Sequence, residues 1–183
     1  MTYRNLLASR LRLFAGLALV GLLSACSTLD RGTAPALDPQ ASWAVLPFEN
    51  HTETPMAGNR AAAIAAALLG ARGVGPVKRY TADSVQDTLF DNRDAKRRED
   101  ALAWARGEGV RYALTGAVDE WRYKVGVDGE PAVGVALEIV DVNSGATLWS
   151  ATGGQSGWSR EALSAVGQKL IRNLLGTGLA NAR

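Results

Sequence analysis

The alternation of apolar and polar positions predicts that strands and helices follow one another along most of the chain. Residues 42–48 form a nearly continuous apolar run closed by turn-forming residues, which predicts a short buried strand. Residues 57–69 are rich in alanine and stop at Gly70, which predicts a helix with Gly70 as its C-cap. Because most of its side chains are methyl groups, this helix can lie close to a sheet or to a neighbouring subunit.

The middle of the chain predicts one further strand and two helices. Residues 76–80 fit a short strand, and residues 81–83 offer N-cap side chains for a helix through Leu89. Residues 94–106 predict a surface helix in which charges of both signs are mixed. Such mixing is typical of a solvated helix face rather than of a binding patch.

The last third of the chain predicts a three-stranded meander followed by a helix. Its strands are expected at residues 112–125, 132–142 and 146–152, with turn chemistry at residues 143–145. Ser159 is expected to cap the final helix. The apolar stripe of this helix consists of Leu163, Val166, Leu170, Ile171 and Leu174.

This order predicts a single globular domain over residues 42–183. The expected fold class is α/β, resembling α+β in three-layer form: a mixed sheet of about five strands that ends in the meander, with helices packed on the sheet. About 140 residues are enough to bury a substantial core.

The N-terminus has the pattern of an export signal. Residues 1–12 contain three arginines and no acidic residue, and residues 13–23 are apolar or small. This run is too short to cross a bilayer as a helix, which needs about 20 residues. We therefore predict a signal peptide over residues 1–25.

Cys26 is the expected lipidation site. Residues 23–26 read Leu-Ser-Ala-Cys, the lipobox of bacterial lipoproteins, and Cys26 is the only cysteine of the chain. Residues 26–41 are then expected to be a lipidated tether. Ser27 stands where an Asp would signal retention in the inner membrane, so we expect the lipid anchor to hold the protein on the periplasmic face of the outer membrane.

Charge and candidate chemistry exclude several functions. Of 20 basic and 18 acidic side chains, three arginines lie in the signal peptide, which leaves 17 against 18 and no reason to expect nucleic-acid binding. His51 is the only histidine and the only thiol, Cys26, is expected to carry lipid, so no Cys/His zinc site is expected. We expect no cofactor, and His51 fits an ordinary loop residue better than a catalytic base.

Two acidic residues and one tryptophan are singled out for other roles. Asp119 and Glu120 are adjacent on a strand, so their side chains are expected on opposite faces and one should reach solvent; the pattern leaves open which. No catalytic set is evident, and we expect no enzyme. Among five tryptophans, Trp149 follows a hairpin turn, where an exposed indole would suit the lipid headgroup region.

Four segments together with the lipobox resemble the PelC family, outer-membrane lipoproteins of the Pel polysaccharide export system. They are Trp-Ala-Val-Leu-Pro-Phe-Glu-Asn at 43–50, Pro-Met-Ala-Gly at 55–58, Gly-Val-Arg-Tyr-Ala-Leu-Thr-Gly at 109–116 and Asp-Val-Asn-Ser-Gly-Ala-Thr-Leu-Trp at 141–149. The resemblance extends over nearly all of the mature chain.

The resemblance implies a non-enzymatic, dodecameric ring beneath the outer membrane. An aromatic belt would touch the bilayer, and an acidic funnel would guide the cationic exopolysaccharide toward the outer-membrane porin PelB, for the biofilm matrix. Trp149 would then belong to the belt, Asp119 to the acidic surface, and Cys26 would carry the anchor.

Three other functions fit parts of the pattern. A lipoprotein that activates a peptidoglycan synthase, or a secretion-channel subunit related to curli export, would share the strand and turn motifs, although an activator would need a longer tether. An enzyme acting on envelope sugars would have Asp119 and Glu49 as its only plausible carboxylates.

Overall fold

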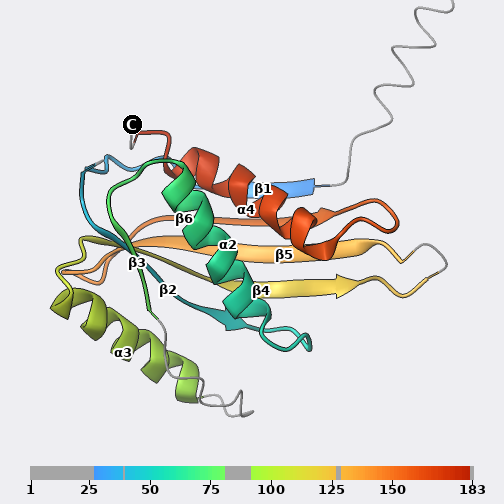
Figure 1. The fold of residues 1–183 in the computed structure, drawn as a ribbon, viewed down its shortest axis with the longest axis horizontal. Helices are drawn as coiled ribbons and strands as arrows, with labels where there is room; N and C mark the ends of the chain where they lie inside the picture. The colour runs from blue at the N-terminus through green and yellow to red at the C-terminus, as the bar shows by residue number, and fades with distance from the viewer. Residues whose placement is uncertain (1–26, 39, 81–91, 127–128, 182–183) are drawn as a thin grey trace, which may run out of the picture.

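The computed structural model describes residues 27–38, 40–80, 92–126 and 129–181, and within them six strands form one mixed sheet. Across the sheet the strand order is β1-β6-β5-β4-β2-β3 (Figure 1). The strands are β1 (Ser27–Arg31), β2 (Trp43–Asn50), β3 (Val77–Arg79), β4 (Tyr112–Tyr123), β5 (Pro131–Asp141) and β6 (Thr147–Ser156). The described helices are α2 (Ala57–Ala71), α3 (Asn92–Gly107) and α4 (Leu163–Gly178).

The predicted fold class is confirmed, with six strands in place of about five. β2 runs parallel to β3 and to β4, whereas β4, β5 and β6 are joined antiparallel to one another as the expected meander. The additional strand is β1, which pairs antiparallel with the outer edge of β6.

β1 corrects the prediction that residues 26–41 are only a tether. Ser27–Arg31 is hydrogen-bonded along β6, with Ser27 opposite Gln155 and Arg31 opposite Ala151. Leu37 is buried in the main core. The folded domain therefore includes Ser27, which directly follows the expected lipidation site.

The helices lie on both faces of the sheet and produce the expected three layers. α2 and α4 pack side by side on one face, and α3 covers β2 on the other (Figure 1). The larger core lies under α2 and α4, and the smaller core lies under α3 and includes Ala44, Leu46, Ala101 and Ala105. β2 reads as an unbroken apolar run because it contacts a helix on each face.

Small residues bring α2 close to the sheet, as the sequence predicts. Ala57, Ala61 and Ala65 are fully buried, and a Cβ on Gly58 would meet the Phe48 carbonyl oxygen at 2.2 Å. The predicted C-cap at Gly70 is wrong, because the helix continues to Ala71 and Gly73 takes the left-handed conformation, with φ +69°.

α4 confirms the predicted apolar stripe but begins later than expected. Val166, Leu170, Ile171 and Leu174 are completely buried. Ser159 is not the N-cap, which is Ala162. The preceding loop is held instead by Glu161, whose carboxylate accepts a hydrogen bond from the Trp158 backbone N–H at 3.2 Å.

Two predictions concern residues that lie outside the described part of the chain: the signal peptide with Cys26, and the helix through Leu89. Across the described ranges, none of the helices has the length and apolar character needed to span a membrane.

Candidate functional site

A β-bulge in β4 places two acidic side chains on the sheet face that α2 and α4 leave free. Val118 and Trp121 both belong to the main core, and the pairing with β5 shifts between Val118 and Glu120. Asp119 and Glu120 therefore share the opposite face, and a Cβ built on Gly134 would lie 3.9 Å and 3.4 Å from their respective Cβ atoms. The expectation of opposite faces is wrong, because strict alternation fails at a bulge.

The loop after β2 brings His51 over this bulge. The His51 backbone N–H donates to the Val118 carbonyl at 2.9 Å. The next turn is closed by Asn50, whose amide donates to the Thr54 carbonyl at 2.9 Å and whose side-chain oxygen accepts from the Thr52 hydroxyl at 2.8 Å. The Thr54 hydroxyl donates to the Trp121 carbonyl, so the loop is fixed to β4 at both ends.

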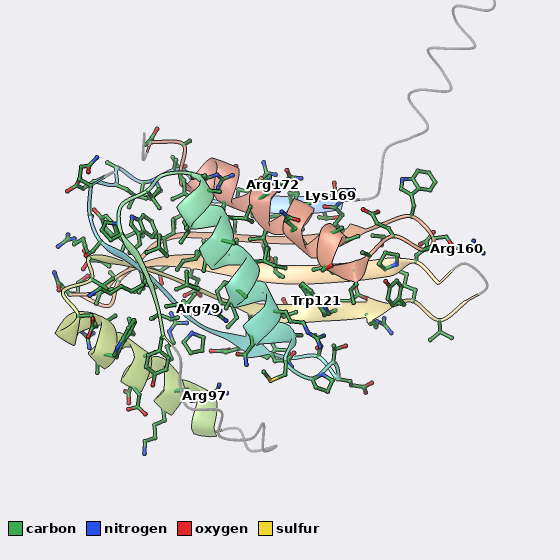
Figure 2. All side chains as sticks on the ribbon, in the orientation of Figure 1. Arg79, Arg97, Trp121, Arg160, Lys169 and Arg172 are labelled. Atoms are coloured by element: carbon green, nitrogen blue, oxygen red, sulfur yellow. The ribbon has the colours of Figure 1, made fainter. Side chains whose placement is uncertain are left out.

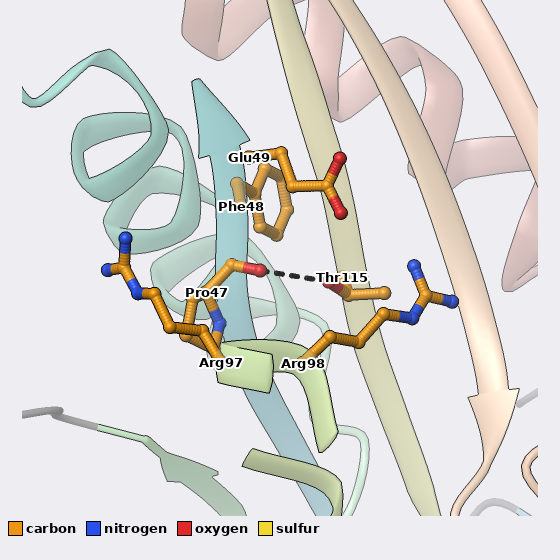
Figure 3. A pocket seen from close by; sticks show the side chains of 6 residues that line it. All are labelled: Pro47, Phe48, Glu49, Arg97, Arg98 and Thr115. Carbon is orange, nitrogen blue, oxygen red and sulfur yellow. Dashed lines mark hydrogen bonds between the residues drawn. The ribbon is translucent and has the colours of Figure 1, made fainter. Parts of the chain in front are cut away.

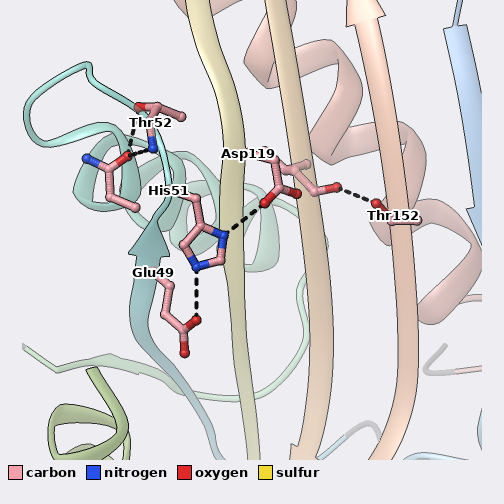
Figure 4. Close-up of polar contacts among 7 residues, drawn as sticks. Glu49, His51, Thr52, Asp119 and Thr152 are labelled. Carbon is pink, nitrogen blue, oxygen red and sulfur yellow. Dashed lines mark hydrogen bonds and ion pairs between the residues drawn. The ribbon is translucent and has the colours of Figure 1, made fainter. Parts of the chain in front are cut away.

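The imidazole of His51 lies between two carboxylates (Figure 4). Its Nδ1 is 3.0 Å from Asp119 Oδ1, and its Nε2 is 3.3 Å from Glu49 Oε2. The His51 and Asp119 side chains are 52% and 54% exposed, so the group is open to solvent. We call these three residues the His51 cluster.

Both carboxylates favour the protonated form of His51. The hydrogen bond with Asp119 is the largest cause that raises the pKa of His51 above 6.5, and Glu49 adds to it, while partial burial opposes the rise. Since the raised pKa belongs to the folded state, this contribution to folding is complete below pH 6.5 and is lost as the pH rises through the folded-state pKa.

A small pocket adjoins the cluster on the side of α3. Arg97 and Arg98 of α3 line it together with Glu49, Thr115, Pro47 and Phe48 (Figure 3). The guanidinium of Arg98 pairs with Glu138 at 2.7 Å, and Arg122 pairs with Glu120 at 3.0 Å. Glu138 and Glu120 therefore have arginine partners, whereas Asp119 contacts His51.

The geometry argues against both catalytic interpretations. Each ring nitrogen of His51 faces a carboxylate, so neither is directed at a serine hydroxyl for which it could act as base. The imidazole also occupies the space between Glu49 and Asp119, where a glycosidic bond would have to lie. What the cluster offers is a solvent-exposed, anionic surface that can attract cations.

Trp149 corrects the expectation of an exposed aromatic residue. Its side chain is 3% exposed, its Nε1 donates to the Gly32 carbonyl at 3.1 Å, and a Cβ on Gly178 would meet its ring at 2.9 Å. The hairpin position is right, but Gly32, which directly follows β1, and Gly178 at the end of α4 enclose the indole. Trp149 is a core residue.

Among the described residues, the exposed aromatic side chains and an exposed valine lie at the opposite end of the strands. Trp158 is 66% exposed in the loop before α4, and Val125 is fully exposed beyond β4. Tyr123 joins these two segments, because its hydroxyl donates to the Glu161 carbonyl at 3.0 Å. In Figure 2, Arg160 extends past the strand ends at this same end. We call Tyr123, Val125, Trp158 and Arg160 the strand-end patch.

β1 connects this patch to the expected lipidation site through the chain itself. Ser27 pairs with Gln155, three positions before Trp158, and Cys26 immediately precedes Ser27. Consecutive Cα atoms are 3.8 Å apart, so an acyl chain on Cys26 would begin beside the strand-end patch. The sequence alone did not single out Trp158, because its significance depends on the unpredicted pairing of β1.

Comparison with solved structures shows high similarity to a PelC dodecamer from Paraburkholderia phytofirmans. The identity is 44% with a TM-score of 0.72, over 86% of this chain and 99% of that chain. A single-residue variant of that dodecamer gives 43% identity and a TM-score of 0.71, over 83% and 97% of the two chains. A lipoprotein of Neisseria meningitidis shares the fold at 21% identity, with a TM-score of 0.53 over 77% of this chain and 99% of that one. No protein-family model matches the chain, and no curated protein sequence matches it.

Proposed function

Since this chain belongs to the PelC family, we propose that it is a lipid-anchored outer-membrane protein that assembles into a homo-oligomeric ring and guides the Pel polysaccharide to its export porin. The observation that carries the proposal is the 44% identity to a PelC that forms a dodecamer, spread over 99% of that chain. Identity of this extent leaves no large part of the relative without a counterpart here.

Cys26 and the strand-end patch supply the membrane contact in this proposal. Acyl chains on Cys26 contribute about 0.8 kcal/mol for each buried methylene, and an exposed tryptophan suits the headgroup region. Trp158 thus takes the role that the sequence had suggested for Trp149. Arg160 adds a cation that favours anionic headgroups.

The His51 cluster supplies the surface that attracts the polymer. His51 lies between the carboxylates of Glu49 and Asp119. Two carboxylates outweigh one imidazolium, so the cluster keeps a negative charge in either protonation state of the ring. A ring repeats this charge once per subunit, and a concave arrangement concentrates the field that acts on a cationic chain. A nearly neutral subunit can in this way present a strongly negative surface.

The position of β1 disfavours an activator of a peptidoglycan synthase. Such a protein must extend from the outer membrane to a partner across the periplasm, which requires a long flexible tether. Here the residue that follows Cys26 is already part of a strand.

The assembly is tested by native mass spectrometry of residues 27–183 without the lipid. We expect a single homo-oligomer, with the dodecamer of the relative as the expected size. A chain that stays monomeric at high concentration would contradict the ring.

The export role is tested in cells that lack their own copy of the chain. The full-length protein is expected to restore secreted matrix, whereas Cys26→Ala and Trp158→Ala are expected to reduce it. Surface-exposed Glu99→Gln on α3 serves as the matched control, because it lies outside both the cluster and the patch. Full restoration by Cys26→Ala would contradict membrane anchoring as part of the function.

A further inference from the structure

We propose that His51 is a proton-operated counter-ion: protonated, it clamps Glu49 to Asp119 and leaves the cluster with one net negative charge, and on losing its proton it opens one contact and leaves two. The inference that this switch controls binding of a cationic polymer rests on the proposed function. The switch itself rests only on the geometry of the cluster.

The two contacts of the ring require two protons. Neutral imidazole has one N–H donor and one lone pair, whereas imidazolium has two donors. Nδ1 and Nε2 both face carboxylate oxygens, at 3.0 Å and 3.3 Å. In the neutral form one of these contacts would set a lone pair against a carboxylate oxygen, which is repulsive. Deprotonation therefore weakens one side of the clamp as well as changing the charge.

The charged groups around the cluster do not duplicate this change. On the α3 side, Arg97 and Arg98 line the pocket with Glu49, and arginine stays protonated throughout the relevant pH range. Along β4, Glu120 is paired with Arg122. On β5, Gly134 and Val135 pair across the bulge and do not titrate, and Glu138 is paired with Arg98.

His51 is thus the group of this site suited to respond near neutral pH, because carboxylates and arginines titrate far from it. The exposure of the His51 and Asp119 side chains lets a ligand reach them from solvent. By linkage, a cation that binds the open, doubly negative form more tightly must also lower the proton affinity of His51.

The proton switch is tested by NMR on residues 27–183. Because the chain has a single histidine, its ring signals are assigned without ambiguity. Titration from about pH 5 to about pH 9 is expected to give a midpoint above 6.5, the value for free histidine. Asp119→Asn should lower the midpoint most, and Glu49→Gln should lower it less.

Asp30→Asn is the matched control for this titration. Asp30 lies on β1, opposite Thr152 of β6, and its removal deletes one negative charge without touching the ring. A midpoint unchanged by Asp119→Asn, or lowered as much by Asp30→Asn, would overturn the clamp. Circular dichroism of each variant would confirm that the fold is retained.

The functional consequence is tested by the binding of N,N,N-trimethylglucosamine oligomers, whose quaternary ammonium groups stay charged at every pH, to the same protein. One added unit charge about 4 Å from an ammonium is worth about 1 kcal/mol in water, so affinity should rise about fivefold per contact as His51 deprotonates. His51→Gln should bind as tightly as the deprotonated protein at every pH. His51→Lys, which stays cationic, should bind weakly at every pH.

The titration and the binding measurements separate the two hypotheses. A raised midpoint that depends on Asp119, with no oligomer binding at any pH, would leave the switch intact and contradict the polymer-guiding function. Oligomer binding of the same strength in wild type, His51→Gln and His51→Lys would leave the polymer-guiding function intact and overturn the switch.

Discussion

At the scale of the residue, the two tryptophans Trp149 and Trp158 differ in their surroundings although only nine positions separate them. Trp149 is enclosed by Gly32 and Gly178, whose missing side chains make room for the indole. Trp158 projects from the loop before α4 into solvent. The same residue type is therefore a packing element at one position and a candidate contact surface at the other.

Substitution of each tryptophan should separate these roles. Trp149→Ala is expected to lower the free energy of unfolding by about 3–5 kcal/mol, because it leaves a cavity. Trp149→Phe should lower the free energy of unfolding by less, although it loses the hydrogen bond to Gly32, worth about 1 kcal/mol. Trp158→Ala should change the free energy of unfolding by less than about 0.5 kcal/mol.

Urea denaturation followed by far-ultraviolet circular dichroism measures these differences. Equal stability of Trp149→Ala and Trp158→Ala would contradict the burial of Trp149.

Neither role could be assigned from local sequence. The Gly32 carbonyl that accepts the Trp149 hydrogen bond is 117 positions away, and the His51 contact with Asp119 joins residues 68 positions apart. Only the folded chain brings such partners together.

At the scale of the element, the turn between β5 and β6 depends on one carboxylate. Asp141 Oδ1 accepts hydrogen bonds from the backbone N–H groups of Asn143 and Ser144, each at 3.0 Å. Its Oδ2 pairs with Arg111 at 2.8 Å. The Ser144 N–H, the Arg111 charge and the Asn143 N–H hold the pKa of Asp141 below its usual value of 3.8.

The lowered pKa of Asp141 gives the stability a defined pH dependence. Its contribution is complete above the unfolded-state value of 3.8 and is lost as the pH falls through the folded-state pKa. Asp141→Asn should therefore be destabilising at neutral pH, and the difference from wild type should shrink in acid, where the native carboxylate is also protonated. Urea unfolding of both proteins at pH 7 and near pH 2 measures the difference in their free energies of unfolding. A difference that is larger in acid would contradict this account.

The sequence predicted most elements of the fold because their periodicity is local. Alternation in β5 and the apolar stripe of α4 each reflect one buried face, and both predictions are confirmed. The failures concern features set by partners. β1 has few apolar residues and becomes a strand by pairing with β6, and the bulge at Asp119 arises from the register between β4 and β5.

At the scale of the whole molecule, the His51 cluster and the strand-end patch, the proposed membrane contact, are close together. Asp119 precedes Tyr123 by four positions on β4, and a strand rises about 3.3 Å per residue, so about 13 Å separates the cluster from the strand-end patch. With that patch on the bilayer, the negative surface would lie just beneath the headgroups. A cationic polymer would then be concentrated immediately below the membrane that it has to cross.

This geometry predicts that the direct connection of Cys26 to β1, without a linker, matters as much for export as the lipid itself. Twelve Ser/Gly residues, beginning with Ser, can be inserted between Cys26 and Ser27. The residue that directly follows Cys26, where an Asp would signal retention in the inner membrane, then remains a serine. Such a linker has a mean end-to-end distance of about 20 Å, which exceeds the distance between patch and cluster. We expect the inserted variant to remain membrane-bound and oligomeric but to lose most matrix export, because β1 no longer fixes the height of the sheet.

Cell fractionation, native mass spectrometry and matrix staining measure these three properties separately. The same twelve residues appended after Arg183 provide the control for added length, and that variant should export normally. Export by the inserted variant at the wild-type level would mean that the acyl chains only retain the protein at the membrane. Loss of export together with loss of the oligomer would instead assign to β1 a role in assembly, since β1 is an edge strand of the sheet that a neighbouring subunit could reach.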